Sequence, residues 1–482
     1  MNLYVINHSF AYELENLTRA FFPNEKITTL REAECLEPPY VYTEVSGNLL
    51  KVKVSVDGKE AEEISEAEEK DDKELILATL LYACLTKICN RTLPWGLLTG
   101  VRPIKLMRRL SELYGGIDEA KKYLTDTLLV SKEKLNLATT TEANERKILE
   151  LSRKDSFSLY VSIPFCPTRC NYCSFVSQSV EKAKHLISPY VDILLEEIKE
   201  TARIAADLKL RLETVYIGGG TPTTLSAEDL SRVISTIRQS FDMSFVREFT
   251  VEAGRPDTIT EEKLRAIISS GCDRLSINPQ TLNDKVLEVI GRKHTTEEFY
   301  SAFNLARKLG FRHINTDLIA GLDTDTVESF KSTIDGIVAL NPESVTIHTL
   351  SMKRSSFITA ENKLITESSN TSVSDMLSYG YESLRREAYR PYYMYRQSKM
   401  LGNLENTGWA KEGFDGLYNV YIMDETHTIL ACGAGAVSKL KAFGSEHLER
   451  IFNFKYPYEY IDRYDELRLR KQAVYEFYEK YF

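Results

Sequence analysis

The sequence predicts an α/β protein in which a central parallel sheet covered by helices is flanked by two α+β regions. From about residue 157 to about residue 350, apolar strands alternate with amphipathic helices in six successive β-α units. On either side of this part the alternation stops. We therefore expect three segments: an N-terminal α+β region over 1–155, the α/β part over 156–370, and a smaller α+β domain over 371–482.

The α/β part is expected to have parallel strands joined by right-handed crossovers. Hydrophobic periodicity alone leaves two arrangements open, an open doubly wound sheet and a curved partial barrel. The expected strands are 159–163, 214–217, 249–252, 274–277, 315–319 and 344–349. The expected helices lie near 182–208, 226–240, 260–270, 296–309 and 325–339.

The two flanking regions mix strands and helices. At the N-terminus we expect a strand at 3–6, a helix at 12–22, a hairpin of 40–45 with 49–56, and helices at 74–90, 103–114, 117–127 and 131–151. At the C-terminus we expect a helix at 371–389, a hairpin of 417–423 with 428–432, and helices at 457–468 and 470–480. The acidic stretch 60–74 is interpreted as a solvated loop or helix face.

Composition excludes several classes of protein. The hydrophobic content of 43% is that of a globular chain, and no apolar run reaches the length of about 18 residues that a membrane span needs. Residues 1–10 lack the features of a secretory signal, so we expect a cytoplasmic location. Eight cysteines are too few for a disulfide scaffold, and a net charge of −9 disfavours nonspecific nucleic-acid binding.

Three cysteines crowd into a loop directly after the first strand of the β-α series. Cys166, Cys170 and Cys173 have the spacing C-x-x-x-C-x-x-C. Cysteine thiolates bind iron–sulfur clusters, and three of them can hold three irons while a fourth iron stays open for a small molecule. A structural zinc site is the alternative, but it needs a fourth ligand, and the closest histidine, His185, lies twelve residues past Cys173.

This cysteine motif resembles the signature of the radical S-adenosylmethionine (SAM) superfamily. The resemblance implies a 4Fe-4S cluster on Cys166, Cys170 and Cys173, whose open iron chelates the amino and carboxylate groups of SAM. It also implies that the cluster donates an electron and that a 5′-deoxyadenosyl radical forms. Tyr172 stands where that family places an aromatic residue against adenine. The fold implied is a partial (β/α)6 radical SAM barrel.

The flanking sequence resembles a narrower group, the oxygen-independent coproporphyrinogen III dehydrogenases. The matching stretches are Tyr160-Val-Ser-Ile-Pro-Phe-Cys166 and Tyr216-Ile-Gly-Gly-Gly-Thr-Pro-Thr223. Three glycines after a strand let the backbone approach a ligand closely, and their N–H groups can meet its polar ends. We expect cofactor contacts from Tyr160, Gly219, Gly220 and Thr221.

Further matches to this group follow in order along the chain. In a sheet of parallel strands, ligands gather at the carboxyl ends, and each of these residues lies at or just after such an end. Gln280 and Arg292 stand twelve apart, as the corresponding pair does in the group. At the position of His348 the group contacts the cofactor through a backbone atom, so the expected contact does not require the imidazole. The expected cofactor-binding residues are Glu252, Gln280, Arg292, Asp317 and His348.

The whole chain resembles the HemZ-type branch of this coproporphyrinogen III oxidase-like family, through 94–103 and 402–406 among other stretches. The resemblance implies a heme-biosynthetic oxidoreductase that converts two propionates of coproporphyrinogen III to vinyl groups, giving protoporphyrinogen IX. The implied partners are a porphyrinogen or heme ligand and an electron donor such as flavodoxin or ferredoxin. No nucleic acid and no membrane span are expected.

A substrate with four carboxylates should be met by cationic side chains. We expect Arg102 and Lys105, in a cluster with Arg108 and Arg109, and Arg396 near Lys399. Tyrosines 392, 393 and 395 could pack against a tetrapyrrole face, with Tyr395 as the candidate. The alternative for each group is a basic solvent face and core tyrosines. The segments 1–155 and 371–482 are the possible substrate-covering parts.

One position departs from the dehydrogenase pattern and keeps other functions open. The dehydrogenases carry a fourth cysteine two residues after the third ligand, and here that residue is Phe175. Phenylalanine there resembles the related heme-chaperone branch, which binds heme without dehydrogenase activity. A heme-binding trafficking protein, an anaerobic heme-degrading enzyme and a noncatalytic scaffold are therefore alternatives. Heme titration separates the chaperone from the enzyme.

Overall fold

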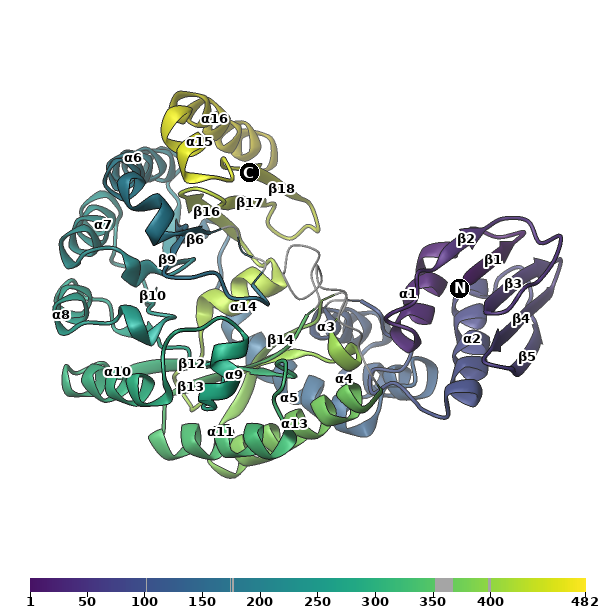
Figure 1. Cartoon of the computed structure of the whole chain (residues 1–482). Helices are drawn as coiled ribbons and strands as arrows, with labels where there is room; N and C mark the ends of the chain where they lie inside the picture. Colours follow the sequence, from purple (N-terminus) through teal and green to yellow (C-terminus); the bar gives the residue numbers. More distant parts are fainter. Residues whose placement is uncertain (101, 174, 176, 352–366, 398–399) are drawn as a thin grey trace. The chain divides into compact units, whose positions relative to one another are not determined.

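The computed structural model describes residues 1–100, 102–173, 175, 177–351, 367–397 and 400–482 (Figure 1). The chain divides into two compact units. Unit 1 consists of Met1–Thr139, Asn362–Ser374 and Tyr395–Glu405. Unit 2 consists of Thr140–Glu361, Asp375–Met394 and Asn406–Phe482. These boundaries differ from the three expected segments because strands from the C-terminal part join the same sheet as the β-α series.

Unit 1 begins with a five-stranded sheet whose order is β2-β1-β3-β4-β5, covered by two helices (Figure 1). Side chains such as Leu3, Val52 and Leu81 are fully buried between the sheet and the helices. The expected strand, helix and hairpin are confirmed here. The elements are β1 (Asn2–Ile6), α1 (Ala11–Phe21), β2 (Thr28–Leu30), β3 (Tyr40–Ser46), β4 (Leu49–Val56), β5 (Lys59–Glu66) and α2 (Lys73–Cys89).

The acidic stretch is not only a solvated loop or helix face, because its first part forms the edge strand β5. This strand pairs antiparallel with β4, and the cross-strand ion pair between Lys51 and Glu62 joins their side chains at 3.0 Å. Acidic side chains on an edge strand discourage pairing with another chain. The charge pattern therefore fits an edge strand, although it contains few residues that favour strands.

Helices follow the sheet of unit 1, close to the expected positions. Pro103 occupies the first turn of α3, where its missing N–H leaves no intrahelical bond unmade. The helical elements are α3 (Pro103–Tyr114), α4 (Ile117–Lys122), a π-helical turn (Tyr123–Thr127) and α5 (Lys132–Leu149), the last of which crosses into unit 2. Among the residues that the structure describes, no helix is both long and apolar enough to cross a bilayer.

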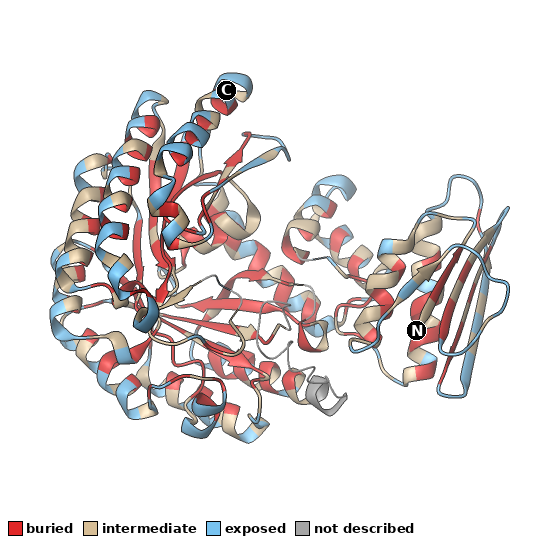
Figure 2. Cartoon of the chain, turned by 45° about the horizontal axis from the view of Figure 1, so that its top comes forward, coloured by how far each residue is buried: buried red, intermediate tan, exposed pale blue. Residues whose placement is uncertain are grey.

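Unit 2 confirms the six β-α units, because six strands lie side by side in chain order and each pair is parallel. The strands are β6 (Ser156–Ile163), β9 (Arg211–Gly219), β10 (Glu248–Glu252), β11 (Arg274–Ser276), β12 (His313–Ala320) and β13 (Ser344–Thr349). The helices are α6 (Val180–Asp207), α7 (Ala227–Ser240), α8 (Glu261–Ser269), α10 (Thr296–Lys308) and α11 (Val327–Leu340). A short helix, α9 (Asp284–Val289), is additional. Figure 2 shows the strands buried and the outer helix faces exposed.

The C-terminal part extends this sheet at both edges. Strand β15 pairs antiparallel with β13, whereas β16 pairs parallel with β6. The full order is β14-β15-β13-β12-β11-β10-β9-β6-β16-β17-β18, which leaves the barrel open, as a partial barrel should be. These strands are β14 (Arg390–Tyr395), β15 (Asn406–Ala410), β16 (Thr428–Cys432), β17 (Val437–Lys441) and β18 (Leu448–Phe452). The accompanying helices are α13 (Glu367–Arg386), α15 (Pro457–Asp462) and α16 (Tyr464–Tyr481).

The expected hairpin of 417–423 with 428–432 is wrong in its first half. Leu417–Asp424 is a helix, α14, and its first N–H donates to Glu248 Oε2 at 2.6 Å. The segment is rich in aromatic and branched residues that favour strands locally. Burial overrides that preference, because Tyr418, Val420 and Tyr421 all lie in the interior of the unit.

A buried ion pair ties helix α16 to helix α6. Lys471 Nζ lies 3.0 Å from Glu197 Oε1, and neither side chain is more than 5% exposed. Glu197 also accepts from the Gly433 N–H at 2.7 Å and from the Tyr460 hydroxyl at 2.6 Å. The carboxylate is therefore satisfied on several sides, as a buried charge must be. This network holds the loop after β16 in place.

Candidate functional site

The three cysteines lie on the loop that follows β6. Strand β7 (Phe165–Cys166) pairs with β8 (Gln178–Ser179), and the Cys173 N–H donates to the Cys170 carbonyl at 3.1 Å. Burial, together with the neighbouring thiols of Cys170 and Cys166, raises the pKa of Cys173 to about 11. The thiols are therefore close enough to influence one another. Among the described residues, no group of three or more His, Cys, Asp or Glu side chains is arranged to hold a single metal ion. A cubane makes a different demand, because each thiolate binds a different iron.

The cysteine loop is anchored on α9, the short helix that the sequence pattern missed. The Asn171 N–H donates to the Ile290 carbonyl at 3.0 Å, and its side-chain amide donates to the Val289 carbonyl at 2.8 Å. The Thr168 hydroxyl donates to the Gly291 carbonyl at 3.1 Å. The end of α9 therefore fixes the cysteine loop on both sides of Cys170, through Thr168 before it and Asn171 after it.

The glycine run at the end of β9 packs against the start of the cysteine loop. A Cβ at Gly220 would lie 2.6 Å from the Phe165 carbonyl and 3.0 Å from Cys166 Sγ, so only glycine fits. Gly219 has φ +109°, a conformation that side chains rarely adopt. The Thr221 hydroxyl donates to Cys166 Sγ at 3.6 Å. The glycine backbone thus approaches another group closely, as expected, and that group is the protein's own cysteine loop.

An aromatic stack with a carboxylate lies inside the barrel. Tyr160 on β6, Tyr216 on β9 and Tyr418 on α14 have nearly parallel rings, and the centroids of Tyr216 and Tyr418 are 4.5 Å apart. The Tyr216 hydroxyl donates to Glu252 Oε1 at 2.5 Å. Burial, with the charge of Asp317, raises the pKa of Glu252 to about 7 despite the hydrogen bond from Tyr216. A carboxylate so placed can accept a cationic amino group.

Gln280 and Arg292 lie on the same side of the sheet, beyond β11. Arg292 is 8% exposed and donates to the Asn278 carbonyl at 2.5 Å and to the Tyr172 hydroxyl at 3.2 Å. Gln280 has φ +69°, and its backbone bridges to β12. Its buried Oε1 atom has no hydrogen-bond partner among the residues that the structure describes. A buried amide oxygen without a donor is costly unless a ligand supplies one.

Asp317 and His348 face each other from neighbouring strands, β12 and β13. His348 Nε2 lies 3.9 Å from Asp317 Oδ2, and Asn315 donates to the other carboxylate oxygen at 2.8 Å. Burial acts to raise the pKa of Asp317, but hydrogen bonds and charge from His348, with the Asn315 amide, outweigh it and the pKa is lowered. Asp317 therefore stays ionised beside a carboxylate, Glu252, that holds its proton more tightly.

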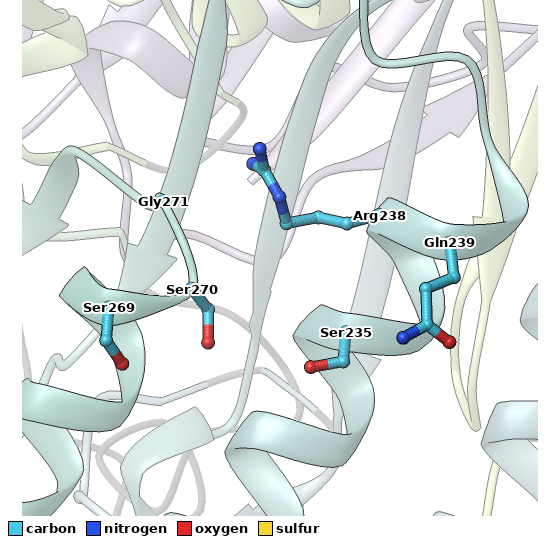
Figure 3. A pocket seen from close by; sticks show the side chains of 6 residues that line it. All are labelled: Ser235, Arg238, Gln239, Ser269, Ser270 and Gly271. Atoms are coloured by element: carbon cyan, nitrogen blue, oxygen red, sulfur yellow. The ribbon is translucent and has the colours of Figure 1, made fainter.

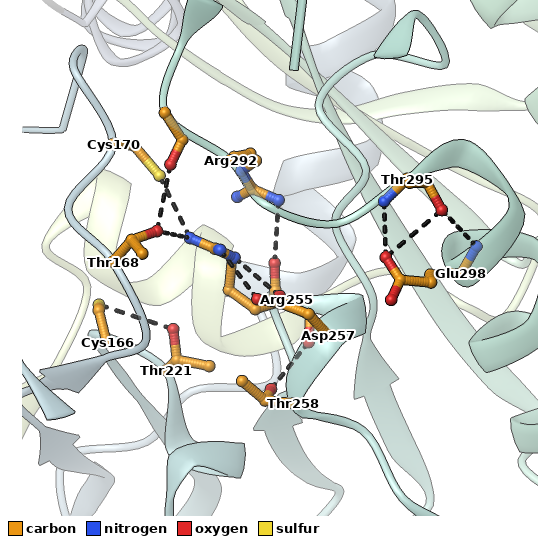
Figure 4. A network of polar contacts seen from close by, with 12 residues as sticks. Cys166, Thr168, Cys170, Thr221, Arg255, Asp257, Thr258, Arg292, Thr295 and Glu298 are labelled. Atoms are coloured by element: carbon orange, nitrogen blue, oxygen red, sulfur yellow. Dashed lines mark hydrogen bonds and ion pairs between the residues drawn. The ribbon is translucent and has the colours of Figure 1, made fainter. Parts of the chain in front are cut away.

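Arg255 is a site residue that sequence reasoning missed. It follows β10 closely, and its guanidinium contacts Cys170 Sγ at 3.7 Å and the Thr168 hydroxyl at 3.1 Å (Figure 4). Asp257 accepts two parallel bonds from it, each 3.0 Å long. Burial and the charges of Arg292 and Arg255 lower the pKa of the neighbouring His294 to about 3. The only local signal was an arginine shortly after the end of a strand.

Two of the predicted substrate residues lie at the start of α3 in unit 1. Arg102 is the residue that precedes the helix, and Lys105 lies in its first turn; both are partly buried. Their role in binding substrate stays a prediction, as does that of the partly buried Tyr395 at the end of β14. Lys399 lies outside the described residues.

Arg396 serves its own unit. Its guanidinium is 3% exposed and donates to the carbonyls of Leu98 at 2.7 Å and Asn403 at 2.9 Å. It also lies over the ring of Trp95, with 5.5 Å between the guanidinium carbon and the ring centroid. Backbone carbonyls thus accept hydrogen bonds from the guanidinium N–H groups that were expected to bind a substrate carboxylate. Arg396 is therefore not part of the proposed substrate site.

Tyr392 and Tyr393 are core residues and offer no open ring face. They are 0% and 4% exposed. A Cβ at Gly408 would lie only 1.9 Å from the Tyr393 ring, so this tyrosine packs directly on the neighbouring strand β15. The alternative of core tyrosines is therefore correct for this pair.

A separate surface pocket of about 310 Å³ lies between α7 and the end of α8 (Figure 3). Arg238 reaches across it toward Gly271, where a Cβ would lie 2.9 Å from the guanidinium. The pocket is on the outer helices, away from the cysteine loop, and we assign no chemistry to it. It is lined by Ser235, Arg238, Gln239, Ser269, Ser270 and Gly271.

Comparison with known proteins agrees with this geometry. Residues 160–337 match the Radical SAM superfamily. The chain is 36% identical over 405 residues to the oxygen-independent coproporphyrinogen-III oxidase-like protein HemZ of Bacillus subtilis, covering 82% of this chain and 80% of the relative. The chain belongs to the HemZ-type family of radical SAM proteins. It is also 29% identical to the heme chaperone HemW of Lactococcus lactis, over 62% of this chain and 73% of that protein.

The fold is shared with a solved radical SAM enzyme. The structure of coproporphyrinogen III oxidase HemN from Escherichia coli superposes with a TM-score of 0.52 at 23% identity, covering 67% of this chain and 72% of that one. Membership of the radical SAM superfamily identifies the cofactors as a 4Fe-4S cluster and SAM. The HemZ-type chain offers groups that fit these cofactors: three neighbouring thiols on one loop, and the buried oxygen of Gln280, for which the described part of the chain supplies no donor.

Proposed function

We propose that this protein carries out the oxygen-independent oxidative decarboxylation of two propionate side chains of coproporphyrinogen III. Each propionate would lose a hydrogen atom from its β-carbon to the 5′-deoxyadenosyl radical, then carbon dioxide, and one electron to an external electron acceptor, and so become a vinyl group. The observation that carries the proposal is the 36% identity to a coproporphyrinogen-III oxidase-like protein over four-fifths of both chains, together with an intact thiol loop.

The residues of unit 2 divide the work of holding the cofactors. Cys166, Cys170 and Cys173 would hold the cluster, which with SAM supplies the radical that removes the hydrogen atom. In our proposal the Glu252 carboxylate binds the amino group of SAM. A nearby cation stabilises the charged form of a partly buried carboxylate, such as this one beside Tyr216. Gln280 would contact SAM through its side-chain amide, whose buried oxygen accepts from none of the described residues.

Arg102 and Lys105 are our proposed partners for the substrate carboxylates. The reason is chemical: guanidinium and ammonium groups form charge-assisted hydrogen bonds with carboxylates. The variant Arg102→Ala should weaken porphyrinogen binding and leave SAM cleavage intact, while Lys122→Ala, on an exposed position of α4, should change neither. An equal loss of both activities in Arg102→Ala contradicts this assignment.

The function is tested with anaerobically reconstituted protein, SAM, a reductant and coproporphyrinogen III. We expect protoporphyrinogen IX and 5′-deoxyadenosine, and neither product from Cys170→Ala. Cluster assembly without either product rejects the proposed reaction.

Heme binding without turnover is a second candidate function, and two observations favour it. HemW proteins are among the relatives, and Phe175, at the position of the fourth cysteine of the dehydrogenases, is 63% exposed. Titration of heme into the full chain distinguishes the two. Tight stoichiometric binding with no conversion of coproporphyrinogen III selects the heme-binding function.

A further inference from the structure

The guanidinium of Arg255 is aimed at one cluster-binding cysteine. The side chain is 3% exposed, and its Nη1 atom donates to Cys170 Sγ at 3.7 Å and to the Thr168 hydroxyl at 3.1 Å (Figure 4). The same nitrogen therefore contacts both the second thiol and the residue that fixes the preceding turn of the loop. Arg255 therefore does more than stabilise its own turn, because its guanidinium also contacts the cysteine loop.

Asp257 fixes the direction of that guanidinium. Its two carboxylate oxygens accept from Nε and Nη2 of Arg255 at 3.0 Å each, which leaves Nη1 pointing at the sulfur. This fork-to-fork geometry is specific to arginine, because a lysine ammonium is a point charge on a flexible stem. The short helical turn Pro256–Thr258 holds the pair, since the Thr258 hydroxyl donates to the Arg255 carbonyl at 2.8 Å.

A second guanidinium lies close to the same sulfur. Burial acts to lower the pKa of Arg292, but the charges of Tyr172 and Cys170 and hydrogen bonds to both outweigh it, so the pKa is raised. Arg292 is held by two carbonyl groups, Asn278 at 2.5 Å and Gly254 at 3.3 Å. Cys170 therefore has two guanidinium groups beside it, those of Arg255 and Arg292.

We propose that Arg255 is a positioning residue that donates an N–H···S hydrogen bond to the Cys170 thiolate and thereby raises the reduction potential of the cluster. Adding an electron increases the negative charge on the thiolate sulfurs, so a fixed donor stabilises the reduced state more than the oxidised state. Asp257 keeps the donor in place. The inference concerns the cluster alone and does not depend on which porphyrin compound the protein binds.

The test is a redox titration of the cluster, followed by electron paramagnetic resonance, in the reconstituted full chain without substrate. We expect the midpoint potential of Arg255→Gln to be more negative than that of the wild type at unchanged iron and sulfide content. Arg255→Lys should lie between the two, and Asp257→Asn should shift in the same direction by less. Circular dichroism verifies the fold of each variant.

Arg265→Gln is the matched control. Arg265 makes a similar two-nitrogen contact, with Glu261 on the exposed face of α8 in the same unit, and it does not touch the cysteine loop in the described contacts. Its removal deletes one positive charge at a distance and should leave the potential unchanged. A shift as large as that of Arg255→Gln would mean that net charge, rather than the sulfur contact, sets the potential, and it would overturn the proposal.

An Arg255→Gln midpoint that equals that of the wild type, or is less negative, overturns the inference. If Arg255→Gln folds but holds no iron, it gives no midpoint. The Arg255→Lys midpoint then decides: a value below the wild type supports the proposal, and an equal value overturns it.

Discussion

The Tyr216 hydroxyl donates to the Glu252 carboxylate inside the barrel, across the neighbouring strands β9 and β10. The ring of Tyr216 stacks in turn on Tyr418 of α14. A carboxylate at the carboxyl end of the sheet is therefore oriented by a tyrosine whose own position depends on a helix from the C-terminal part. The candidate site and the packing of α14 are physically coupled.

The stability of the cofactor-free protein should depend on the protonation of Glu252. Burial, with the charge of Asp317, raises the pKa of Glu252 from 4.5 to about 7. The folded state then holds a proton that the unfolded chain has released, so the free energy of unfolding falls as the pH rises between these values and stays lower above them. The decrease is on the order of 3 kcal/mol. Urea unfolding at about pH 5 and about pH 8 measures it.

The variant Glu252→Gln should remove most of that pH dependence, because a glutamine does not titrate. Glu262→Gln, on an exposed position of α8, is the control and should keep the slope of the wild type. If the free energy of unfolding falls with pH as steeply in Glu252→Gln as in the wild type, the raised pKa of Glu252 is contradicted.

Removing the ring of Tyr418 should destabilise unit 2. The side chain is 4% exposed and stacks on both Tyr160 and Tyr216. Tyr418→Ala leaves a cavity in the barrel interior, and we expect a loss of about 3–5 kcal/mol in the free energy of unfolding. Tyr458→Ala, at a position that is 48% exposed, should cost less than about 1 kcal/mol. Similar losses in the two variants would show that the stack does not form.

Breaking the Glu197–Lys471 pair should be more damaging than replacing it. Lys471→Met leaves a buried carboxylate without its cation, which costs about 3–5 kcal/mol of unfolding free energy. The double variant Glu197→Gln with Lys471→Met should recover part of this loss. Arg463→Ala removes an exposed pair with Glu466, which water screens, and should cost far less than Lys471→Met. Chemical denaturation measures the free energy of unfolding of all three variants. If Lys471→Met loses no more of it than Arg463→Ala does, the buried Glu197–Lys471 pair does not have the importance proposed here.

Replacing any one of the three loop cysteines should abolish assembly of a stable cluster. Cys166→Ala, Cys170→Ala and Cys173→Ala each remove an iron ligand, so iron content per chain and visible absorbance should fall close to zero after anaerobic reconstitution. Cys272→Ala is the control, because this thiol is 1% exposed and lies between α8 and β11, and its loss should leave iron content unchanged. Iron retained by all three loop variants would rule out the cluster site.

The central fold could be predicted because its strands and helices carry strong local periodicity. The six strands and five helices of the β-α series appear close to their expected positions. Two errors have the same origin. The segment beginning at Leu417 has the composition of a strand but becomes a helix because it is buried in the barrel. Glu60–Glu66 has few strand-favouring residues but completes the sheet of unit 1. In both segments tertiary packing outweighs local preference.

The candidate site could be predicted where a motif is continuous and not where partners are distant in sequence. The cysteine loop and the glycine run are local patterns, and the structure brings them into contact. Arg255 had no such pattern, since its partner Cys170 belongs to another β-α unit. Arg396 had the right chemistry for a carboxylate, but its donors are taken by carbonyls of its own unit, which no local pattern reveals.

The parallel pairing of β16 with β6 has a consequence for biosynthesis. While the nascent chain is still on the ribosome, the first strand of the barrel has a neighbour on only one side until the segment containing Thr428–Cys432 has been made. An unpaired strand edge is prone to aggregation. We therefore expect barrel completion to wait until this segment has been synthesised, and stable iron loading of the loop next to β6 to follow that step.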